Sequence, residues 1–291
     1  MSTSPLAWTS DAQLTPATTL HARASATFGD KLAETRALLQ QAAIEFTTAD
    51  GQALITQASS LGAEDVVITH LINDLRLNLP IFVLDTGALH TDTLALLEQT
   101  RHTSLAPVAV FQPVQESVVR FVAREGTDAM YRSLALRKEC CAIRKLEPLA
   151  RALEGKQAWI TGLRREQSGN RADVPLRDSS EPDSGQAHGR IKFNPLAHWT
   201  WGDVWHYIAT HGLAYNPLHD RFFPSIGCAP CTRAISLGED FRAGRWWWEA
   251  ELDGGTAKEC GLHATRTDGD ATTTANTPTT PTQQTATGAR A

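Results

Sequence analysis

Short apolar segments alternate with longer amphipathic ones from residue 28 to residue 162, and this alternation limits the folds open to the chain. The longer segments space their apolar residues three and four apart, which is typical of helices. Such an order predicts an α/β fold in which a mainly parallel sheet is flanked by helices. We expect strands at residues 53–58, 80–85, 108–112 and 158–162, and helices at residues 28–46, 64–75, 91–102, 116–124 and 142–153.

The two ends of the chain differ in composition from this central part. Residues 264–291 contain eleven Thr, two Pro and no aliphatic or aromatic residue larger than Ala, so we expect a disordered tail. Residues 1–27 are rich in Ser, Thr and Ala, and we expect them to be loose. We interpret residues 28–250 as a single domain and residues 251–263 as a mobile segment that follows it.

Charge and apolar content exclude several classes of protein. The 27 basic and 32 acidic residues give a net charge of −5, which argues against a general binder of nucleic acid or anionic membranes. Aliphatic runs such as residues 81–84 are far too short to span a bilayer, and residues 1–27 lack the pattern of a secretory signal. We therefore expect a cytoplasmic protein whose five cysteines stay reduced and form no disulfide framework.

Ligands of parallel sheets bind at the carboxyl ends of the strands, so the loops after the predicted strands are candidate sites. The turn from Ser60 to Gly62 leads straight into a helix, where free N–H groups favour an anion. Such turns more often serve only as helix caps. Several arginines after the fourth strand also favour an anion site. The candidates after the second and fourth strands are Asp85, Thr86, Gly87, Arg164, Arg165 and Arg171.

Four of the five cysteines form two tight pairs, Cys140 with Cys141 and Cys228 with Cys231. Two such pairs suit a four-thiolate metal site. Adjacent residues on a helix point about 100° apart, so a single metal ion fits Cys140 and Cys141 poorly and an iron–sulfur cubane fits them better. We rank a cluster first, zinc second and a redox-active dithiol of Cys228 and Cys231 third.

The fifth cysteine, Cys260, lies between Lys258 and His263, just before the expected tail. Cationic neighbours favour the thiolate, which is the reactive form of cysteine. A lone cysteine is usually a small buried apolar residue, so two interpretations stay open. Either Cys260 packs in a core, or its Gly-flanked segment is a mobile arm that delivers a nucleophile.

Seven sequence blocks, which follow one another along the chain, resemble the assimilatory adenylyl-sulfate reductases of the adenosine phosphosulfate / phosphoadenosine phosphosulfate reductase family. The resemblance runs from about residue 28 to residue 263 and includes all five cysteines. The blocks are residues 60–65 (Ser-Leu-Gly-Ala-Glu-Asp), 84–87 (Leu-Asp-Thr-Gly), 140–149 (Cys-Cys-Ala-Ile-Arg-Lys-Leu-Glu-Pro-Leu), 160–168 (Ile-Thr-Gly-Leu-Arg-Arg-Glu-Gln-Ser), 227–232 (Gly-Cys-Ala-Pro-Cys-Thr), 244–249 (Gly-Arg-Trp-Trp-Trp-Glu) and 258–263 (Lys-Glu-Cys-Gly-Leu-His).

The resemblance implies a modified P-loop fold, related to adenine-nucleotide hydrolases of the ATP pyrophosphatase type. It implies one [4Fe–4S] cluster on Cys140, Cys141, Cys228 and Cys231. It also implies that Cys260 attacks the sulfur of adenylyl sulfate, so that AMP leaves and an S-sulfocysteine forms, and that reduced thioredoxin then releases sulfite. We interpret the cluster as a charged structural element that organises Lys145, and not as an electron carrier.

The residues expected to bind the substrate follow from the same match. Cations lower the charge repulsion between a thiolate and a sulfate, and the candidates are Lys145, Arg242, Arg245 and His263. Arg171 resembles a further substrate-contacting arginine of the family, and Arg164 belongs to the same loop. The main chain from Ser60 to Gly62 and the loop of Asp85, Thr86 and Gly87 would hold the nucleotide. We expect Trp246, Trp247 and Trp248 to pack the C-terminal part of the domain.

Three alternatives stay open at this point. The first is the same chemistry on phosphoadenylyl sulfate, and the second is an ATP pyrophosphatase that adenylates a substrate. Against the second, the loop at residues 60–65 lacks one Gly and the final Ser of the Ser-Gly-Gly-x-Asp-Ser type. The third is a non-catalytic iron–sulfur or zinc regulator, which would need a basic or partner-binding surface that the acidic composition does not offer. A homo-oligomer is compatible with all of these readings.

Overall fold

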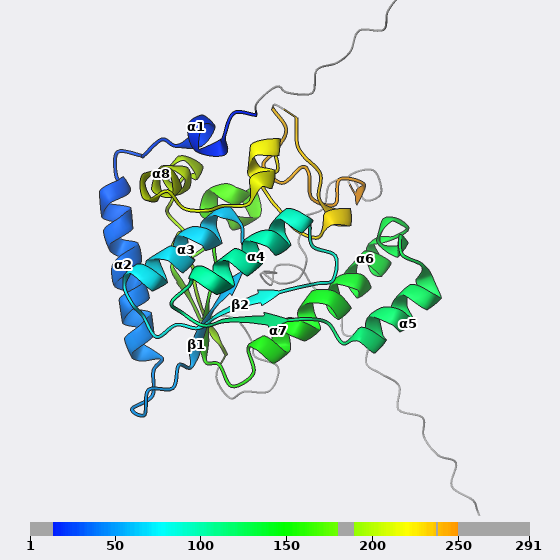
Figure 1. Cartoon of the computed structure of the whole chain (residues 1–291), viewed down its shortest axis with the longest axis horizontal. Helices are drawn as coiled ribbons and strands as arrows, with labels where there is room; N and C mark the ends of the chain where they lie inside the picture. Colours follow the sequence, from blue (N-terminus) through cyan, green and yellow to red (C-terminus); the bar gives the residue numbers. More distant parts are fainter. Residues whose placement is uncertain (1–13, 180–188, 237, 250–291) are drawn as a thin grey trace, which may run out of the picture.

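The computed structural model describes residues 14–179, 189–236 and 238–249. Its centre is a six-stranded sheet of order β3-β2-β1-β4-β6-β5, in which β5 pairs antiparallel with β6 and all other neighbours are parallel (Figure 1). The predicted mainly parallel sheet is therefore confirmed. The strands are β1 (Ile55–Ser59), β2 (Ile81–Leu84), β3 (Val108–Phe111), β4 (Ala158–Ile160), β5 (Arg177–Asp178) and β6 (Ile191–Phe193).

Helices cover both faces of the sheet. Along β2, Ile81 packs in the core with α2, α3 and α8, whereas the next residue, Phe82, packs on the opposite face with α7. This alternation buries consecutive residues of one strand against different helices, as expected for a parallel sheet. The helices are α1 (Ala17–His21), α2 (Phe28–Glu45), α3 (Ala63–Asp74), α4 (Thr91–Thr103), α5 (Gln115–Glu125), α6 (Leu134–Cys141), α7 (Glu147–Ala152) and α8 (Trp201–His211).

The predicted helix at residues 142–153 is divided into two parts. A π-helical turn occupies Ala142–Leu146, and α7 begins directly after it. Pro148 lies in the first turn of α7 and has no N–H to donate to the preceding turn, so the regular hydrogen-bond register cannot run through it. As a result, Lys145 stands on a wide turn that directly follows Cys140 and Cys141.

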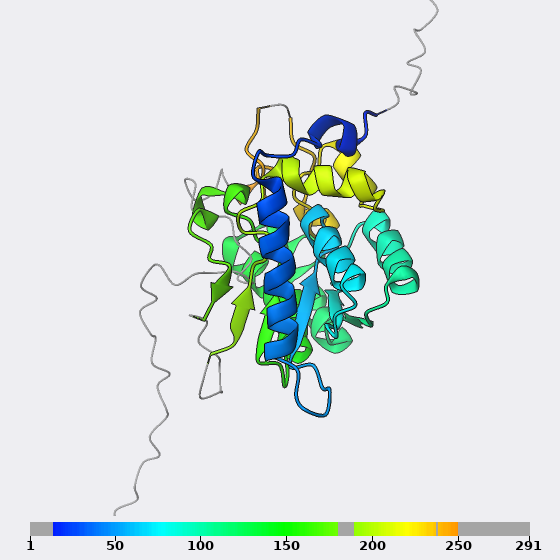
Figure 2. The same ribbon diagram turned by 90° about the vertical axis from the view of Figure 1, so that its left-hand side faces the viewer.

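Residues 14–27, which we expected to be loose, include helix α1 and two long-range hydrogen bonds, although Ala17 is the one buried residue among them. Helix α1 lies against α8 (Figures 1 and 2), and Ala17 is fully buried. The N–H of Ala17 donates to Asp220 at 2.7 Å, and the N–H of Ser25 donates to Asp203 at 2.7 Å. Composition missed this because a few long-range hydrogen bonds, and not an apolar stripe, hold the segment. Residues 1–13, 251–263 and 264–291 lie outside the described residues.

Among the described residues, no helix combines the length and apolar character needed to cross a membrane.

Asp203, on α8, bonds Ser25 and Lys31 near the N-terminus. Because these contacts depend on its negative charge, their contribution to stability depends on pH. Burial alone would raise its pKa, but the Lys31 ammonium at 2.8 Å and the N–H groups of Ser25 and Thr200 lower the pKa to about 2. A carboxylate whose pKa is lowered by folding stabilises the fold at pH values above its pKa in the unfolded chain, which is near 3.8. This contribution is lost as the pH falls through about 2.

We predict that Asp203→Asn lowers the free energy of unfolding by about 2 kcal/mol at pH 7, because the charged hydrogen bonds are lost. The difference from the parent protein should shrink as the pH falls from about 4 towards 2. Urea unfolding at a series of pH values measures this difference. A difference that stays the same across that range would contradict the assignment.

Candidate active site

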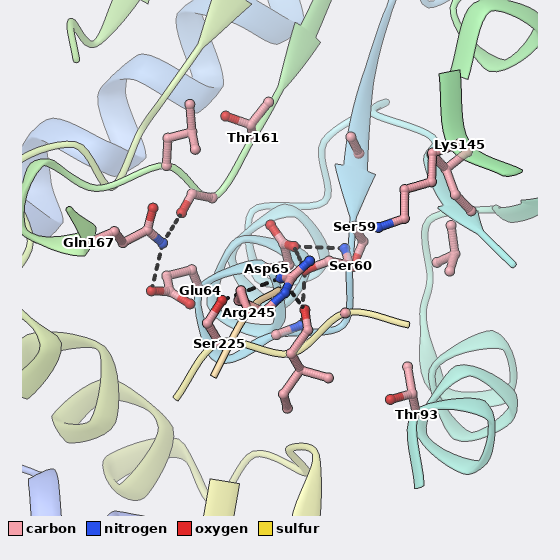
Figure 3. Close-up of a pocket in the computed structure, with 18 of the residues that line it drawn as sticks. Ser59, Ser60, Glu64, Asp65, Thr93, Lys145, Thr161, Gln167, Ser225 and Arg245 are labelled. Atoms are coloured by element: carbon pink, nitrogen blue, oxygen red, sulfur yellow. Dashed lines mark hydrogen bonds between the residues drawn. The ribbon is translucent and has the colours of Figure 1, made fainter. Parts of the chain in front are cut away.

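A cavity of about 210 Å³ opens at the carboxyl ends of β1, β2 and β4. This is the edge at which ligands of parallel sheets bind. Gln167 and Glu64 lie on one side of it, and Lys145 enters from the opposite side (Figure 3). The residues named above as site candidates that line the cavity are Ser60, Gly62, Thr86, Lys145, Arg171, Cys228, Arg242 and Arg245.

The loop after β1 is organised by a carboxylate of its own helix. Asp65 accepts the Ser60 N–H at 2.7 Å and the Ser60 hydroxyl at 2.6 Å. The neighbouring Leu61 has a left-handed backbone (φ 61°), which turns the chain sharply into α3. The Ser60 N–H and hydroxyl, which we expected to face an anion, therefore already donate to Asp65 within the protein.

Gly162, after β4, lies directly against this carboxylate. A Cβ at this position would stand 2.5 Å from Asp65 Oδ1 and 2.9 Å from Glu64 Cβ. The loop after β4 thus packs directly against the first turn of α3, and a side chain at residue 162 would push the two apart. The burial that results raises the pKa of Asp65 to about 6, despite the hydrogen bonds from Ser60.

Arg164 does not line the cavity. Its guanidinium is fully buried and bonds Glu64 at 2.8 Å and Glu166 at 2.9 Å, with the Trp201 ring 5.3 Å away. Gln167 continues the network, because it donates to Glu64 at 2.9 Å and accepts from Arg171. The arginines of this loop therefore divide, with Arg164 tying the loop to α3 and Arg171 facing the cavity.

The loop after β2 lies between the cavity and the cysteines. Asp85 and Gly87 are outside the cavity lining, and the N–H of Gly87 donates to Asp85 at 3.0 Å. Thr86 faces inward, and its hydroxyl lies 3.2 Å from the Cys228 sulfur. Arg144 donates to the Thr86 carbonyl at 2.7 Å. Within this loop, Thr86 is thus the residue that contacts both the cavity and a cysteine.

Cys140, Cys141, Cys228 and Cys231 are all buried, and none of these described cysteines is in a disulfide. We call these four thiols the cysteine nest. Cys228 interacts electrostatically with Cys140 and Cys231, and Cys231 also with Cys141, so the two pairs face each other. Within the described ranges, no group of three His, Cys, Asp or Glu side chains has the arrangement for a single metal ion.

Two buried cations stand between the nest and the cavity. Lys145 and Arg245 line the cavity, and both act on Cys228. Burial alone raises the pKa of the Cys228 thiol, but Lys145, the Thr86 hydroxyl and Arg245 together hold the pKa below its usual value. Cys231 differs, because burial and the neighbouring Cys228 raise its pKa to about 12. The site therefore favours negative charge on the cavity side of the nest.

Comparison with known proteins identifies the chain. The phosphoadenosine phosphosulfate reductase domain matches residues 54–234. The chain belongs to this family. It is 50% identical over 209 residues, 72% of its length, to the adenosine 5'-phosphosulfate reductase of Allochromatium vinosum, of which 78% is covered. It is 51% identical over 207 residues, 71% of its length, to the namesake from Neisseria meningitidis, of which 80% is covered.

A solved structure supports the fold of this family member. Phosphoadenylyl-sulfate reductase from Candida auris aligns with a TM-score of 0.55 at 24% identity, over 71% of this chain and 97% of that chain. The likeness supports the expected α/β fold. Cys260 and His263 lie outside the residues that the structure describes.

In this reductase-family chain, sequence reasoning missed several polar residues of the cavity. Glu64 and Asp65 belong to the block at residues 60–65, but nothing in the sequence assigned them a role at the site. Gln167 follows Arg164 and Arg165, and the loop was interpreted from the charge of its arginines. Thr161 directly follows β4, and Ser225 belongs to none of the seven sequence blocks. The signal available was position, since most of them follow a strand at the carboxyl edge. The cavity residues in question are Glu64, Asp65, Thr161, Gln167 and Ser225.

Asp65 gives this site a pH dependence of opposite sign to that of Asp203. A carboxyl whose pKa is raised by burial stabilises the fold in its protonated form, and this contribution is lost as the pH rises through about 6. We predict that ligand-free Asp65→Asn gains stability relative to the parent as the pH rises from about 4 to 7, by up to about 3 kcal/mol. Denaturant unfolding across that range measures the gain, and a pH-independent difference would contradict it.

Proposed function

We propose that this protein reduces adenylyl sulfate to sulfite and AMP in sulfate assimilation. The relatives in A. vinosum and N. meningitidis are named adenosine 5'-phosphosulfate reductases. The observation on this chain that carries the proposal is the set of cations Lys145, Arg171, Arg242 and Arg245 around one cavity at the carboxyl edge of the sheet. Such a set suits a nucleotide with a dianionic phosphosulfate end.

The reaction begins, in this proposal, with the Cys260 thiolate as nucleophile. Its sulfur forms a bond to the sulfur of the sulfate, the bond from that sulfur to the bridging oxygen breaks, and AMP leaves with the electron pair. The product on the enzyme is an S-sulfocysteine. The cavity cations offset the repulsion between the anionic thiolate and the anionic sulfate, which is greatest at the transition state.

Reduced thioredoxin completes the cycle. One of its thiols attacks the Cys260 sulfur and expels sulfite, which leaves a mixed disulfide between the two proteins. The second thioredoxin thiol resolves that disulfide, so that Cys260 returns as a thiol and thioredoxin leaves oxidised by two electrons. We place this exchange in the cytoplasm, where thiols such as those of the nest remain reduced.

The residues of the nest fit a [4Fe–4S] cluster, which takes cysteine thiolates as ligands. Cys140, Cys141, Cys228 and Cys231 would hold it. The indole N–H of Trp246 is buried beside them and has no hydrogen-bond partner among the described residues, and sulfur can accept such a bond. When bound, the cluster supplies a buried negative charge next to Lys145.

The covalent step is tested by intact mass. Anaerobically purified protein is mixed, without thioredoxin, with adenylyl sulfate or with its 3'-phosphorylated form. We expect the mass to rise by one SO₃ group, to return on addition of reduced thioredoxin, and to stay constant in Cys260→Ser. Adenylyl sulfate should react faster, as the names of the relatives imply.

Absence of the adduct with either nucleotide, in protein that retains its metal, would contradict the covalent mechanism. Release of pyrophosphate from ATP would instead favour the ATP pyrophosphatase alternative.

The cluster is tested separately by chemical analysis. We predict that the same preparation contains iron and acid-labile sulfide in the equal amounts that a [4Fe–4S] cluster requires, and that Cys141→Ser loses both. A serine replacement of the thiol outside the nest, Cys260→Ser, is the matched control and should retain both. Stoichiometric zinc without sulfide would contradict the cluster.

A further inference from the structure

Arg245 is a buried cation without a carboxylate partner among the described residues. Its side chain is 6% exposed, and no carboxylate pairs with it in the part of the chain that the structure describes. Its Nη1 donates weakly to the Ser225 hydroxyl at 3.4 Å and to the Ile226 carbonyl at 3.2 Å, while Nε has no partner among the described residues. An arginine cannot discard its proton, so this burial requires support from elsewhere.

The support on one side is an aromatic ring. The Arg245 guanidinium carbon lies 4.7 Å from the centre of the Trp246 ring, and a second arginine, Arg137, lies 4.6 Å from that same centre. Arg137 is in turn held by Glu249, with Nε to Oε1 at 2.6 Å and Nη2 to Oε2 at 3.1 Å. All four side chains are buried. We call this arrangement the Arg137–Trp246 stack.

The support on the other side is backbone. A Cβ at Gly227 would stand 2.4 Å from Arg245 Nη2, so the guanidinium rests directly against the main chain. Trp246 itself has a left-handed backbone (φ 44°), an unfavourable conformation for a bulky residue that persists only where surrounding contacts impose it. The backbone N–H of Trp246 donates to the Cys231 carbonyl at 3.3 Å. The stack is therefore anchored to the nest.

We propose that Arg137 and Trp246 are positioning residues that hold the Arg245 guanidinium at the anionic end of the bound nucleotide. The inference rests on the proposed function, since it takes adenylyl sulfate as the ligand. Arg137 lies on α6, more than one hundred residues before Arg245, and does not line the cavity. It acts through the ring, because Glu249 fixes Arg137, and Arg137 and Arg245 both pack against Trp246.

The test compares Trp246→Leu, which removes the aromatic face, with Glu249→Gln, which leaves Arg137 without its carboxylate. Binding of adenylyl sulfate and of uncharged adenosine is measured by calorimetry with each change made in Cys260→Ser protein, in which the nucleotide cannot react, and kcat and KM are measured with Cys260 present. We expect affinity for adenylyl sulfate to fall about tenfold in Trp246→Leu, as loss of a desolvated cation–π contact implies, with adenosine affinity unchanged. Glu249→Gln should show the same pattern more weakly.

Arg137→Met completes the series, with the exposed Arg132→Met as its matched control. Arg137 also interacts with the Cys141 thiol, so iron content and visible absorbance are recorded for every variant. If Trp246→Leu fails to fold, Trp246→Phe, which keeps a ring face, and Glu249→Gln carry the comparison. We expect Trp246→Phe to retain most of the affinity for adenylyl sulfate and Arg132→Met to match the parent.

Two outcomes would overturn the inference in a parent protein that turns over adenylyl sulfate. One is an equal loss of affinity for adenosine and adenylyl sulfate, which indicates general damage to the cavity. The other is unchanged affinity for adenylyl sulfate in folded Trp246→Leu and Glu249→Gln. A parent protein that produces no sulfite would instead contradict the proposed function, whatever the variants do.

Discussion

Lys145 and Arg245 each act on a cavity on one side and on a thiol of the cysteine nest on the other. Burying such cations is unfavourable unless anions face them, and here anions can come from both sides. Cys228, whose pKa is lowered, provides negative charge on one side, while the nucleotide provides it on the other only when bound. Most other features of the site keep these two cations in place. The π turn carries Lys145, and the Arg137–Trp246 stack supports Arg245.

The parallel sheet contributes by bringing three loops to one edge. Asp65 closes the loop after β1 on itself, Gly162 lets the loop after β4 approach it, and Arg164 ties that loop to Glu64. These contacts place carboxylates inside the wall of the cavity and leave the cations facing the ligand. A phosphosulfate can then meet positive charge without a reorganisation of the loops, which is the arrangement that electrostatic stabilisation of a transition state requires.

The sequence was most informative where periodicity or motif spacing reports local structure. The expected strands, and the expected helices at residues 28–46, 64–75, 91–102 and 116–124, match the observed ones to within a few residues. The helix expected at residues 142–153 is divided by a π turn, and α6 was not expected. Roles that depend on long-range partners were harder to predict. Arg164 and Arg171 look equivalent in one loop, and only the position of Glu64 separates them. Likewise β6 is three residues long, and α1 is held by Asp220, so neither has a pattern of its own.

We infer that the sulfate of the nucleotide lies next to Lys145 and Arg245, between the cavity and the nest. A crystal structure of Cys260→Ser with bound adenylyl sulfate tests this placement most directly, since the nucleotide cannot react. We expect the phosphosulfate oxygens within hydrogen-bond distance of Lys145 Nζ and of the Arg245 guanidinium, which still packs on Trp246. A nucleotide whose sulfate points away from both cations, while they contact only the nest, would contradict this placement.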